Sequence, residues 1–341
     1  MKAAFIIKKG PADQAFEIRE IPKPEPQAGF VRIKVEAFGL NFADVMARLG
    51  LYPAAPPLPS LIGYDVVGTI DAVGEEVSGL SVGQRVLALT RFGGYAEYAC
   101  TDARAVAVIG EKMSAGVAVA IPTQGGTAYH MAEEMVRLFP GDKVLVHAAA
   151  GGVGTILCQI AKHRGCEVYG TAGSAKKLAY LKEMGVDHPI NYREADFAEV
   201  IRQQLGEKGG LDVIFDPVGG DSVKKGLGLL GASGRLIAFG ASSMTNAKNI
   251  FAKIRTGLAF GFYHPIKLIG PSKGLIGVNM LSIADNRPDI LSRVLKSTVM
   301  LAESGVIHPT IGGEFTIDEL AKAHHLLETR QTMGKLLVRW A

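Results

Sequence analysis

The fold of this chain is decided by residues 143–171, KVLVHAAAGGVGTILCQIAKHRGCEVYGT. The apolar run 144–146 predicts a buried strand, and apolar residues at helical spacing across 153–161 predict a helix after it. Gly165 ends that helix and a second strand follows, so the stretch predicts a β-α-β unit. Its first turn, 148–154, has almost no side chains, which lets backbone N–H groups and a helix N-terminus approach a pyrophosphate. A tight turn without a ligand is the alternative, but the order of the elements favours cofactor binding.

Composition and charge narrow the class of protein. At 341 residues the chain is long for one core, which predicts two domains. Hydrophobic residues make up 48% and charged residues 21%, as in a soluble α/β protein. The net charge of +4 gives no basic field, so no nucleic-acid partner is expected.

Targeting signals are not expected either. The start, MKAAFIIKKG, has too short an apolar core for a signal peptide. The sequence has no uninterrupted apolar run of about 18 residues, so we expect no membrane span. Cys100, Cys158 and Cys166 show no CxxC or His/Cys spacing, which predicts neither a disulfide framework nor a zinc cluster. We therefore expect a cytoplasmic protein.

The order of elements predicts a β-rich first part, then alternating strands and helices. Prolines and tight turns separate the early strands, which favours a compact, partly open barrel. The helical turn 41–50 places Asp44 and Arg48 four residues apart, able to pair. From residue 143 onward the alternation predicts a doubly wound parallel sheet, and the tail is expected to return to the first domain. Strands are expected at 3–8, 16–21, 31–38, 66–73, 85–89, 144–147, 167–171, 189–191, 212–216, 235–239, 275–279, 313–316 and 335–339. Helices are expected at 115–130, interrupted at Gly125-Gly126, and at 152–164, 175–184, 196–205, 221–230, 288–304 and 317–328.

The insert 244–274 is longer than the usual crossover between parallel strands. It combines an apolar stripe with basic residues, a pattern that can lie on a membrane surface. A lid or a packing helix is the alternative, and the sequence leaves both open. The apolar residues are Phe251, Ile254, Leu258, Phe260, Phe262 and Tyr263, and the basic ones are Lys248, Lys253, Arg255, Lys267 and Lys273.

This order of features resembles the medium-chain dehydrogenase/reductase superfamily. The resemblance rests on the barrel-like first part, AAAGGVG at 148–154, Asn191-Tyr192 after the third strand of the parallel sheet, and ETRQTMGKLL at 328–337. Within the superfamily, GLNFADVMARLGLYP at 39–53 and HAAAGGVG are similar to the zinc-independent, zeta-crystallin-like quinone oxidoreductases. The long insert is similar to the vesicle amine transport protein subgroup.

The resemblance covers nearly the whole chain and implies its architecture. We expect an α/β protein with a GroES-like, partly open β-barrel catalytic domain at 1–123 and 288–341. A Rossmann domain with a doubly wound parallel sheet is expected to bind NADPH at 124–287. A homodimer is expected from the resemblance alone.

Departures from the superfamily pattern argue against zinc. Where its alcohol dehydrogenases place a cysteine ligand this chain has Asn41, and where they have Gly-His-Glu it has Gly63-Tyr64-Asp65. The four-cysteine lobe is missing too. Zinc needs several nitrogen or sulfur ligands in tetrahedral geometry, so we expect no metal.

The residues after the second strand favour NADPH over NADH. NAD enzymes place an acid about 20 residues after the glycines, whereas this chain reads TAGSAKK at 171–177. A hydroxyl and ammonium groups suit a 2′-phosphate, which a carboxylate would repel. The resemblance implies Ser174 and Lys177 on the phosphate, Tyr192 beside the adenine ribose and Arg330 at the same end. A solvated first turn of a helix is the alternative, but the helix dipole disfavours lysine there.

The resemblance also implies the remaining site residues. Asn41 is expected to bind the cofactor ribose or a substrate carbonyl, with a helix N-cap as an equal alternative. Tyr52 and Tyr64 are expected to line the quinone site or donate a proton, unless they only pack; Asp65 and the histidines 130 and 147 are expected to be structural. The catalytic candidates are Asn41, Tyr52, Tyr64 and Thr127. The cofactor-binding candidates are Asn41, Thr127, Ala150, Gly151, Gly152, Val153, Gly154, Gly173, Ser174, Lys177, Tyr192, Phe239, Gly240, Asn279 and Arg330.

The leading hypothesis is an NADPH-dependent, zinc-independent reductase that transfers hydride to a quinone. Reduction of a conjugated C=C bond in an enone or enoyl thioester is the close rival, because both reactions deliver hydride to a conjugated acceptor. A membrane-associated binding protein that keeps the cofactor fold is the second class. A methyltransferase is a weaker hypothesis, since it accounts for neither the barrel nor the pattern at Ser174 and Lys177.

Overall fold

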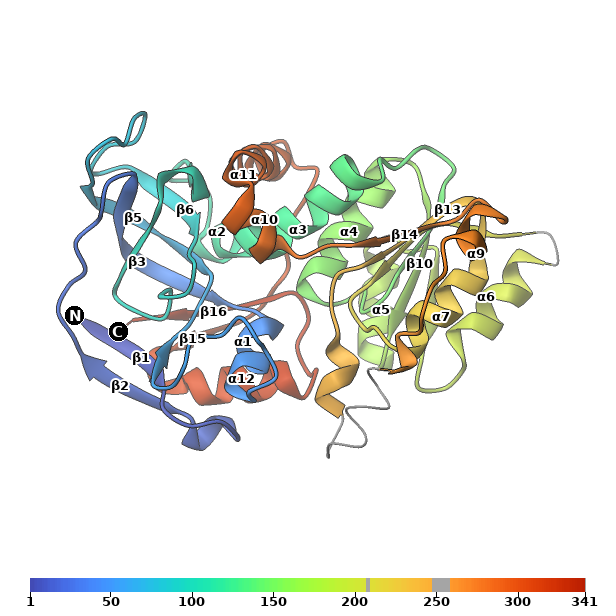
Figure 1. The fold of residues 1–341 in the computed structure, drawn as a ribbon, viewed down its shortest axis with the longest axis horizontal. Coiled ribbons are helices and arrows are strands. Elements are labelled where there is room, and N and C mark those ends of the chain that lie inside the picture. The colour runs from blue at the N-terminus through green and yellow to red at the C-terminus, as the bar shows by residue number, and fades with distance from the viewer. Residues whose placement is uncertain (207–208, 247–257, 341) are drawn as a thin grey trace. The chain divides into compact units, whose positions relative to one another are not determined.

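A computed structural model describes residues 1–206, 209–246 and 258–340. The chain divides into two compact units, which are residues 1–127 with 280–341, and residues 128–279. Figure 1 shows the strands and helices of both, and the predicted α/β class is confirmed.

The first unit is built on a seven-stranded sheet with the order β15-β16-β3-β5-β6-β8, in which β7 also pairs with β3. A three-stranded sheet, β2-β1-β4, completes it. Most of its apolar core side chains are fully buried, among them Ile33, Phe38 and Ile70. Its strands are β1 (Lys2–Ile6), β2 (Phe16–Glu20), β3 (Phe30–Leu40), β4 (Ser60–Leu61), β5 (Asp65–Val73), β6 (Arg85–Leu89), β7 (Tyr98–Asp102), β8 (Val106–Val108), β15 (Ile311–Thr316) and β16 (Lys335–Arg339). Its helices are η1 (Ala12–Gln14), α1 (Phe42–Arg48), η2 (Ala103–Ala105), α2 (Ala115–Ala120), η3 (Ile121–Gly125), α10 (Met280–Asn286), α11 (Pro288–Glu303), η6 (Ile317–Glu319) and α12 (Leu320–Glu328).

The C-terminal strand β16 is an integral part of the first unit. It runs antiparallel to β3, with Leu336 opposite Leu40, and parallel to β15. Figure 1 shows it in red beside the blue β3. The residue before Leu336 is Lys335, which this register brings to the end of β3, where Asn41 follows.

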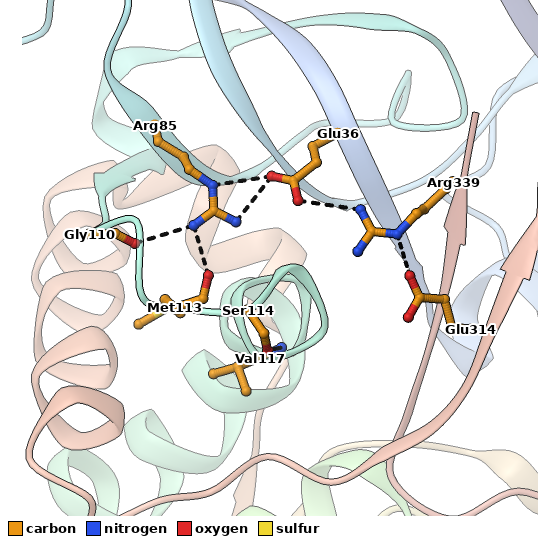
Figure 2. Close-up of polar contacts among 8 residues, drawn as sticks. All are labelled: Glu36, Arg85, Gly110, Met113, Ser114, Val117, Glu314 and Arg339. Atoms are coloured by element: carbon orange, nitrogen blue, oxygen red, sulfur yellow. Dashed lines mark hydrogen bonds and ion pairs between the residues drawn. The ribbon is translucent and has the colours of Figure 1, made fainter. Parts of the chain in front are cut away.

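A chain of ion pairs fastens these strands to one another (Figure 2). The carboxylate of Glu36 on β3 accepts hydrogen bonds from Arg85 on β6, at 3.0 and 3.1 Å, and from Arg339 on β16, at 3.3 Å. Arg339 also pairs with Glu314 on β15, and Arg85 donates to the carbonyl oxygen of Met113 at 2.7 Å. The network therefore links four strands to the turn that precedes α2, which begins at its N-cap Ser114.

The second unit is a six-stranded parallel sheet with the order β11-β10-β9-β12-β13-β14. This order, 3-2-1-4-5-6 along the unit, is that of a Rossmann fold. Its strands are β9 (Lys143–Val146), β10 (Glu167–Ala172), β11 (His188–Asn191), β12 (Leu211–Asp216), β13 (Leu230–Ala238) and β14 (Gly274–Gly277). Its helices are η4 (His130–Met135), α4 (Gly152–His163), α5 (Ala175–Glu183), α6 (Phe197–Leu205), α7 (Asp221–Leu229), η5 (Ser242–Asn246) and α9 (Ile266–Ile269), and α3 (Gly126–Tyr129) spans the boundary between the units.

Several sequence predictions need correction. The strands β4, β7 and β8 and the helix α10 were not predicted, because each is short and lacks a clear period. Gly125-Gly126 does not interrupt the helix, which continues through the π-helical turn η3 into α3. Asp44 and Arg48 do not pair: Asp44 accepts from the backbone N–H of Asn41, and Arg48 pairs with Glu328.

Candidate functional site

In the described part of the chain, the turn after β9 leaves backbone donors without partners. Gly151 is the N-cap of α4, and Gly152, Val153 and Gly154 form the first turn of that helix. Among the described residues, no acceptor takes the N–H groups of these three, as the first turn of a helix requires. Three donors and the positive end of the helix dipole suit an anionic group.

The shape of this turn depends on two close approaches. Ala148 adopts a left-handed φ of 51°, and its N–H is held by the Oγ1 of Thr171 at 3.2 Å. A Cβ on Gly154 would lie 2.4 Å from the carbonyl oxygen of Ala148 and 2.8 Å from the Cα of Ala149. A side chain at residue 154 would therefore force these backbone atoms to move, whereas residue 149 of the same turn is an alanine.

The residues predicted for the 2′-phosphate follow β10. Ser174 caps α5, and its Oγ accepts from the N–H of Lys177 at 3.4 Å. Gly173 allows the ring of Tyr192 to approach, because a Cβ there would lie 2.6 Å from the tyrosine oxygen. The structure therefore brings Gly173, Ser174 and Tyr192 together, and Tyr192 stays 40% exposed.

Sequence reasoning missed a second cation at this place. The Nε of Arg193 would lie 3.1 Å from the same Cβ on Gly173. A basic residue directly after Tyr192 was the available signal. Arg193 sits on the loop after β11, and the parallel pairing of β11 with β10 brings that loop beside the end of β10.

The other cofactor candidates of the second unit lie at the ends of two neighbouring strands. The N–H of Phe239 donates to the carbonyl oxygen of Asp216, and Gly240 lies where a Cβ would be 2.6 Å from the oxygen of Pro217. Asn279 comes after β14, the partner of β13. Thr127 and Arg330 belong to the first unit: Thr127 is 7% exposed on α3, and Arg330 has a left-handed φ of 58° after α12.

Asn41 is the centre of a buried polar cluster in the first unit. Its Nδ2 donates to Asp65 at 2.7 Å, and its Oδ1 accepts from the ammonium group of Lys335 at 2.9 Å. Lys335 also pairs with Asp65, and both side chains have no exposed surface. The second oxygen of Asp65 accepts from the N–H and the hydroxyl of Thr123, at 2.9 and 2.5 Å. Asn41 is also the N-cap residue of α1, and its backbone N–H donates to the carboxylate of Asp44 at 2.8 Å.

Two buried polar atoms of the first unit have no hydrogen-bond partner among the described residues. They are the hydroxyl of Tyr64 and the Oε1 of Gln124, whose Nε2 lies 3.5 Å from Asn41. Burial raises the pKa of Tyr64, and Tyr52 raises it further, although the contact between the two does not reach hydrogen-bond geometry. Gln124 lies on the π-helical turn η3, and such turns are frequent at functional sites. A buried polar group without a partner needs an explanation, and a bound ligand is one such explanation.

A second buried network lies under α1. Burial raises the pKa of Asp44 to about 7, against the hydrogen bond from Asn41, which lowers it. Tyr95 meets the Nε2 of His324 at 3.0 Å, and burial lowers the pKa of His324 to about 3. The Oδ1 of Asp44 and the Nδ1 of His324 also have no hydrogen-bond partner among the described residues.

The predicted structural histidines have local partners. The Nδ1 of His147 lies 3.1 Å from the Oγ1 of Thr171, and burial lowers the pKa of His147. The Nδ1 of His130 lies 3.0 Å from Glu134. Within 1–206, 209–246 and 258–340, no three His, Cys, Asp or Glu side chains are grouped as metal ligands. The residues at the superfamily's zinc position, Asn41 and Tyr64, do not fit that ion.

Comparisons with known proteins fit this geometry. Residues 27–111 match the model of the alcohol dehydrogenase GroES-like domain, and residues 152–264 match that of the zinc-binding dehydrogenases. The synaptic vesicle membrane protein VAT-1 homolog of Rattus norvegicus is 34% identical over 92% of this chain and 78% of its own length. The chain belongs to the medium-chain dehydrogenase/reductase superfamily, in the VAT-1 subgroup. The Danio rerio VAT-1 homolog is 36% identical over 93% of this chain, which spans 65% of that protein.

Solved structures of this superfamily show the same fold. The Escherichia coli quinone oxidoreductase complexed with NADPH superposes with a TM-score of 0.87 at 28% identity, over 99% of this chain and all of that one. The CurK enoyl reductase superposes with a TM-score of 0.84 at 26% identity, over 100% and 99% of the two chains. The predicted GroES-like and Rossmann architecture is confirmed, and the chain belongs to a superfamily of oxidoreductases. None of the described helices is long and apolar enough to cross a membrane.

Proposed function

We propose that this protein is an NADPH-dependent, zinc-independent reductase that transfers hydride to a quinone. The observation that carries the proposal is the turn after β9, where three N–H groups at the start of α4 have no partner among the described residues. A pyrophosphate supplies the acceptors that such a turn needs. The similarity to a quinone oxidoreductase complexed with NADPH supports the same cofactor and substrate class.

The 2′-phosphate of NADPH is assigned to the end of β10. Ser174 offers a hydroxyl, Lys177 and Arg193 carry positive charge, and Tyr192 lies against Gly173 where the adenine ribose would bind. No acidic residue occupies 171–177, so a 2′-phosphate meets no carboxylate there. Phe239, Gly240 and Asn279 would line the nicotinamide end, as the superfamily resemblance implies.

Bound NADPH supplies the hydride, and the overall reaction consumes NADPH, a proton and the quinone and releases NADP⁺ and the hydroquinone. The chain contributes orientation and hydrogen-bond donors. Within the described residues, one N–H of the Asn41 amide and the hydroxyl of Tyr64 have no acceptor, so both can donate to a ligand. Because the pKa of Tyr64 is raised, this hydroxyl keeps its proton and serves as a donor to the quinone oxygen, while solvent protonates the stabilised hydroquinone anion.

The test is NADPH oxidation, followed by absorbance, with a panel of ortho-quinones, para-quinones, enones and enoyl thioesters. We expect turnover with at least one quinone at a kcat/KM above that of every enone and thioester. No turnover with any quinone would reject the proposal.

Reduction of a conjugated C=C bond is the rival within the same class. The similarity to the CurK enoyl reductase is the observation that favours it. The same panel separates the two: preference for an enone or an enoyl thioester would move the assignment to this reaction while leaving the cofactor site unchanged.

Contact with a membrane surface is a second candidate function, and the described part of the insert supports it. Phe260 is anchored, because a Cβ on Gly219 would lie 2.2 Å from its ring, and Tyr263 packs against the core of the second unit. Apolar side chains nearby face solvent with large exposed fractions: Leu258 60%, Phe262 89%, Ile266 68% and Ile269 73%. Several exposed apolar groups within twelve residues, next to Lys267, suit a lipid interface. The residues Lys248, Phe251, Lys253, Ile254 and Arg255 lie outside the described part.

Flotation with liposomes tests this candidate. The protein should float with vesicles that contain anionic lipid, and Phe262→Ser with Ile266→Ser should abolish flotation without changing NADPH oxidation. Val82→Ser is the control, since Val82 is 63% exposed on the first unit. Equal flotation of the double variant and the control, or none for the wild type, rejects membrane contact.

The homodimer also stays a prediction, for which sedimentation velocity is the measurement.

A further inference from the structure

The buried lysine of β16 has no role in the function proposed so far. Lys335 has no exposed surface, and its ammonium group contacts Asn41 and Asp65. Burying a charge is costly unless it is paired and hydrogen-bonded. Replacement of such a pair by apolar residues is often neutral for stability, so its presence calls for a reason beyond folding.

Strand register brings these residues together. β3 lies between β16 and β5, with Leu40 opposite Leu336 and Gly39 opposite both Leu337 and Asp65. The side chain of Lys335 crosses β3 at Gly39, where a Cβ would lie 2.3 Å from its Cε and 2.9 Å from its Nζ. The absence of a side chain at residue 39 is therefore what allows the ammonium group to reach Asp65.

The pair fixes which way the amide of Asn41 points. In the observed orientation the Oδ1 faces the ammonium group, and the Nδ2 faces the carboxylate of Asp65. The flipped amide would set Nδ2 against the ammonium group, two donors together, and Oδ1 against the carboxylate, two acceptors together. Each of these contacts is repulsive, so only one orientation is stable.

This orientation leaves one hydrogen of Nδ2 without a partner among the described residues, since Asp65 takes the other. The ammonium group on Oδ1 also withdraws electron density from the amide, which strengthens the remaining N–H as a donor. We propose that Lys335 and Asp65 are positioning residues that hold Asn41 as a hydrogen-bond donor to a ligand oxygen. That oxygen belongs to the substrate carbonyl or to a ribose hydroxyl of the cofactor, an assignment that rests on the proposed function.

A double-mutant cycle tests the coupling between Lys335 and Asn41. The proteins are the wild type, Asn41→Ala, Lys335→Met and the double variant, and the measurements are NADPH Kd by fluorescence, kcat and KM with the best quinone, and Tm. Lys335→Met should lower kcat/KM by about tenfold or more, in the range seen when a transition-state donor is misplaced. In the Asn41→Ala background it should change kcat/KM by less than about twofold.

The two sources of the oxygen give different results. A weaker NADPH Kd in Lys335→Met assigns the donor to the cofactor ribose, whereas a lower kcat with unchanged Kd assigns it to the substrate carbonyl. Lys322→Met is the control, because Lys322 is 63% exposed and its variant should match the wild type. If Lys335→Met costs as much without Asn41 as with it, Lys335 does not act through Asn41 and the proposal is wrong.

Two further variants guard against misfolding. Lys335→Met with Asp65→Asn removes both charges and frees the amide to flip, so it should keep the loss of kcat/KM even where Tm returns to the wild-type value. Gly39→Ala displaces the ammonium group and leaves every charge in place, and it should give the same loss. Wild-type kcat/KM in a folded protein of either kind overturns the proposal.

The orientation can also be tested without turnover. In ¹⁵N-asparagine-labelled protein, the side-chain amide signals that vanish in Asn41→Ala should exchange slowly in the wild type and shift when NADPH or a quinone is added. They should exchange faster in Lys335→Met with Asp65→Asn. A wild type that turns over no quinone but shows this behaviour would reject the proposed function alone, and equal exchange in both proteins would reject the role of Lys335.

Discussion

Gly154 offers the sharpest test of the cofactor turn. Replacement by alanine would put a Cβ 2.4 Å from the carbonyl oxygen of Ala148 and 2.8 Å from two backbone atoms of Ala149. Ordinary contacts of this kind begin near 3.4 Å, so the turn must move by about 1 Å. The neighbours are backbone atoms, which cannot rotate away as a side chain can.

The expected cost divides between folding and binding. Overpacking costs about 1–3 kcal/mol, and alanine regains about 1 kcal/mol of helix propensity over glycine. A net loss of about 1 kcal/mol corresponds to a drop in Tm of about 3 °C for a unit of this size. The loss of binding is larger. Hydrogen bonds to a charged group contribute about 1.5–3 kcal/mol each, so misplacing one N–H should raise the Kd of NADPH by about tenfold or more.

Titration of NADPH fluorescence and thermal unfolding measure the two costs separately. The matched control is Gly228→Ala, since Gly228 is an exposed residue on α7. The atom nearest to the added Cβ would be a guanidinium nitrogen of Arg202, at 3.9 Å. The control should bind NADPH like the wild type, with an equal or higher Tm. A Gly154→Ala protein with wild-type Kd and Tm would refute the reasoning, because the turn would then have room for the Cβ.

Three further predictions concern other parts of the protein. NADPH should be preferred over NADH by at least about tenfold in KM, and Lys177→Ala should lose this preference while Lys182→Ala, on the same helix, keeps it. Equal use of both cofactors by the wild type would contradict the assignment. The pKa of Asp44 is raised to about 7, so ionisation of Asp44 destabilises the fold. As the pH rises from 4 to 7, the stability of the wild type should therefore fall relative to Asp44→Asn, which thermal unfolding measures. Parallel curves for the two proteins would contradict this prediction. Tyr64→Phe removes a hydroxyl that has no hydrogen-bond partner among the described residues, so Tm should stay within about 2 °C while kcat/KM for the quinone falls about tenfold. Unchanged kcat/KM would make Tyr64 a packing residue.

Local sequence patterns predict most of the longer strands and helices. The six strands of the second unit and its helices α4, α5, α6 and α7 follow from period and turn residues, and β6 and β16 agree with their predicted bounds to the residue. Short elements escaped for a physical reason: β4 has two residues and β8 three, which is too short for a period. Their conformation is set by pairing with β1 and β6, partners distant in the chain.

Side-chain partners were harder to predict than elements. The spacing of Asp44 and Arg48 satisfied the rule for a helical ion pair, but Arg48 pairs with Glu328 and Asp44 caps its own helix. The rule for i, i+4 ion pairs considers only residues on one helix. The buried guanidinium of Arg48 instead pairs with Glu328, which is distant in the sequence. Arg193 escaped for a similar reason, since its place beside Gly173 depends on the pairing of β10 with β11.

Asn41 shows what a resemblance leaves undecided. The family resemblance implies a ligand role for Asn41, and the preference of asparagine for the N-cap position predicts a capping role as an equal alternative. The two proposed roles use different atoms: the backbone N–H of Asn41 is bonded to Asp44 at 2.8 Å, while the side chain contacts Asp65 and Lys335. The cap fixes the backbone and the ion pair fixes the amide, so the N-cap role supports the ligand role. Rigid placement of this kind is what a donor to a hydride acceptor requires, because the gain in rate comes from donors that need no reorganisation.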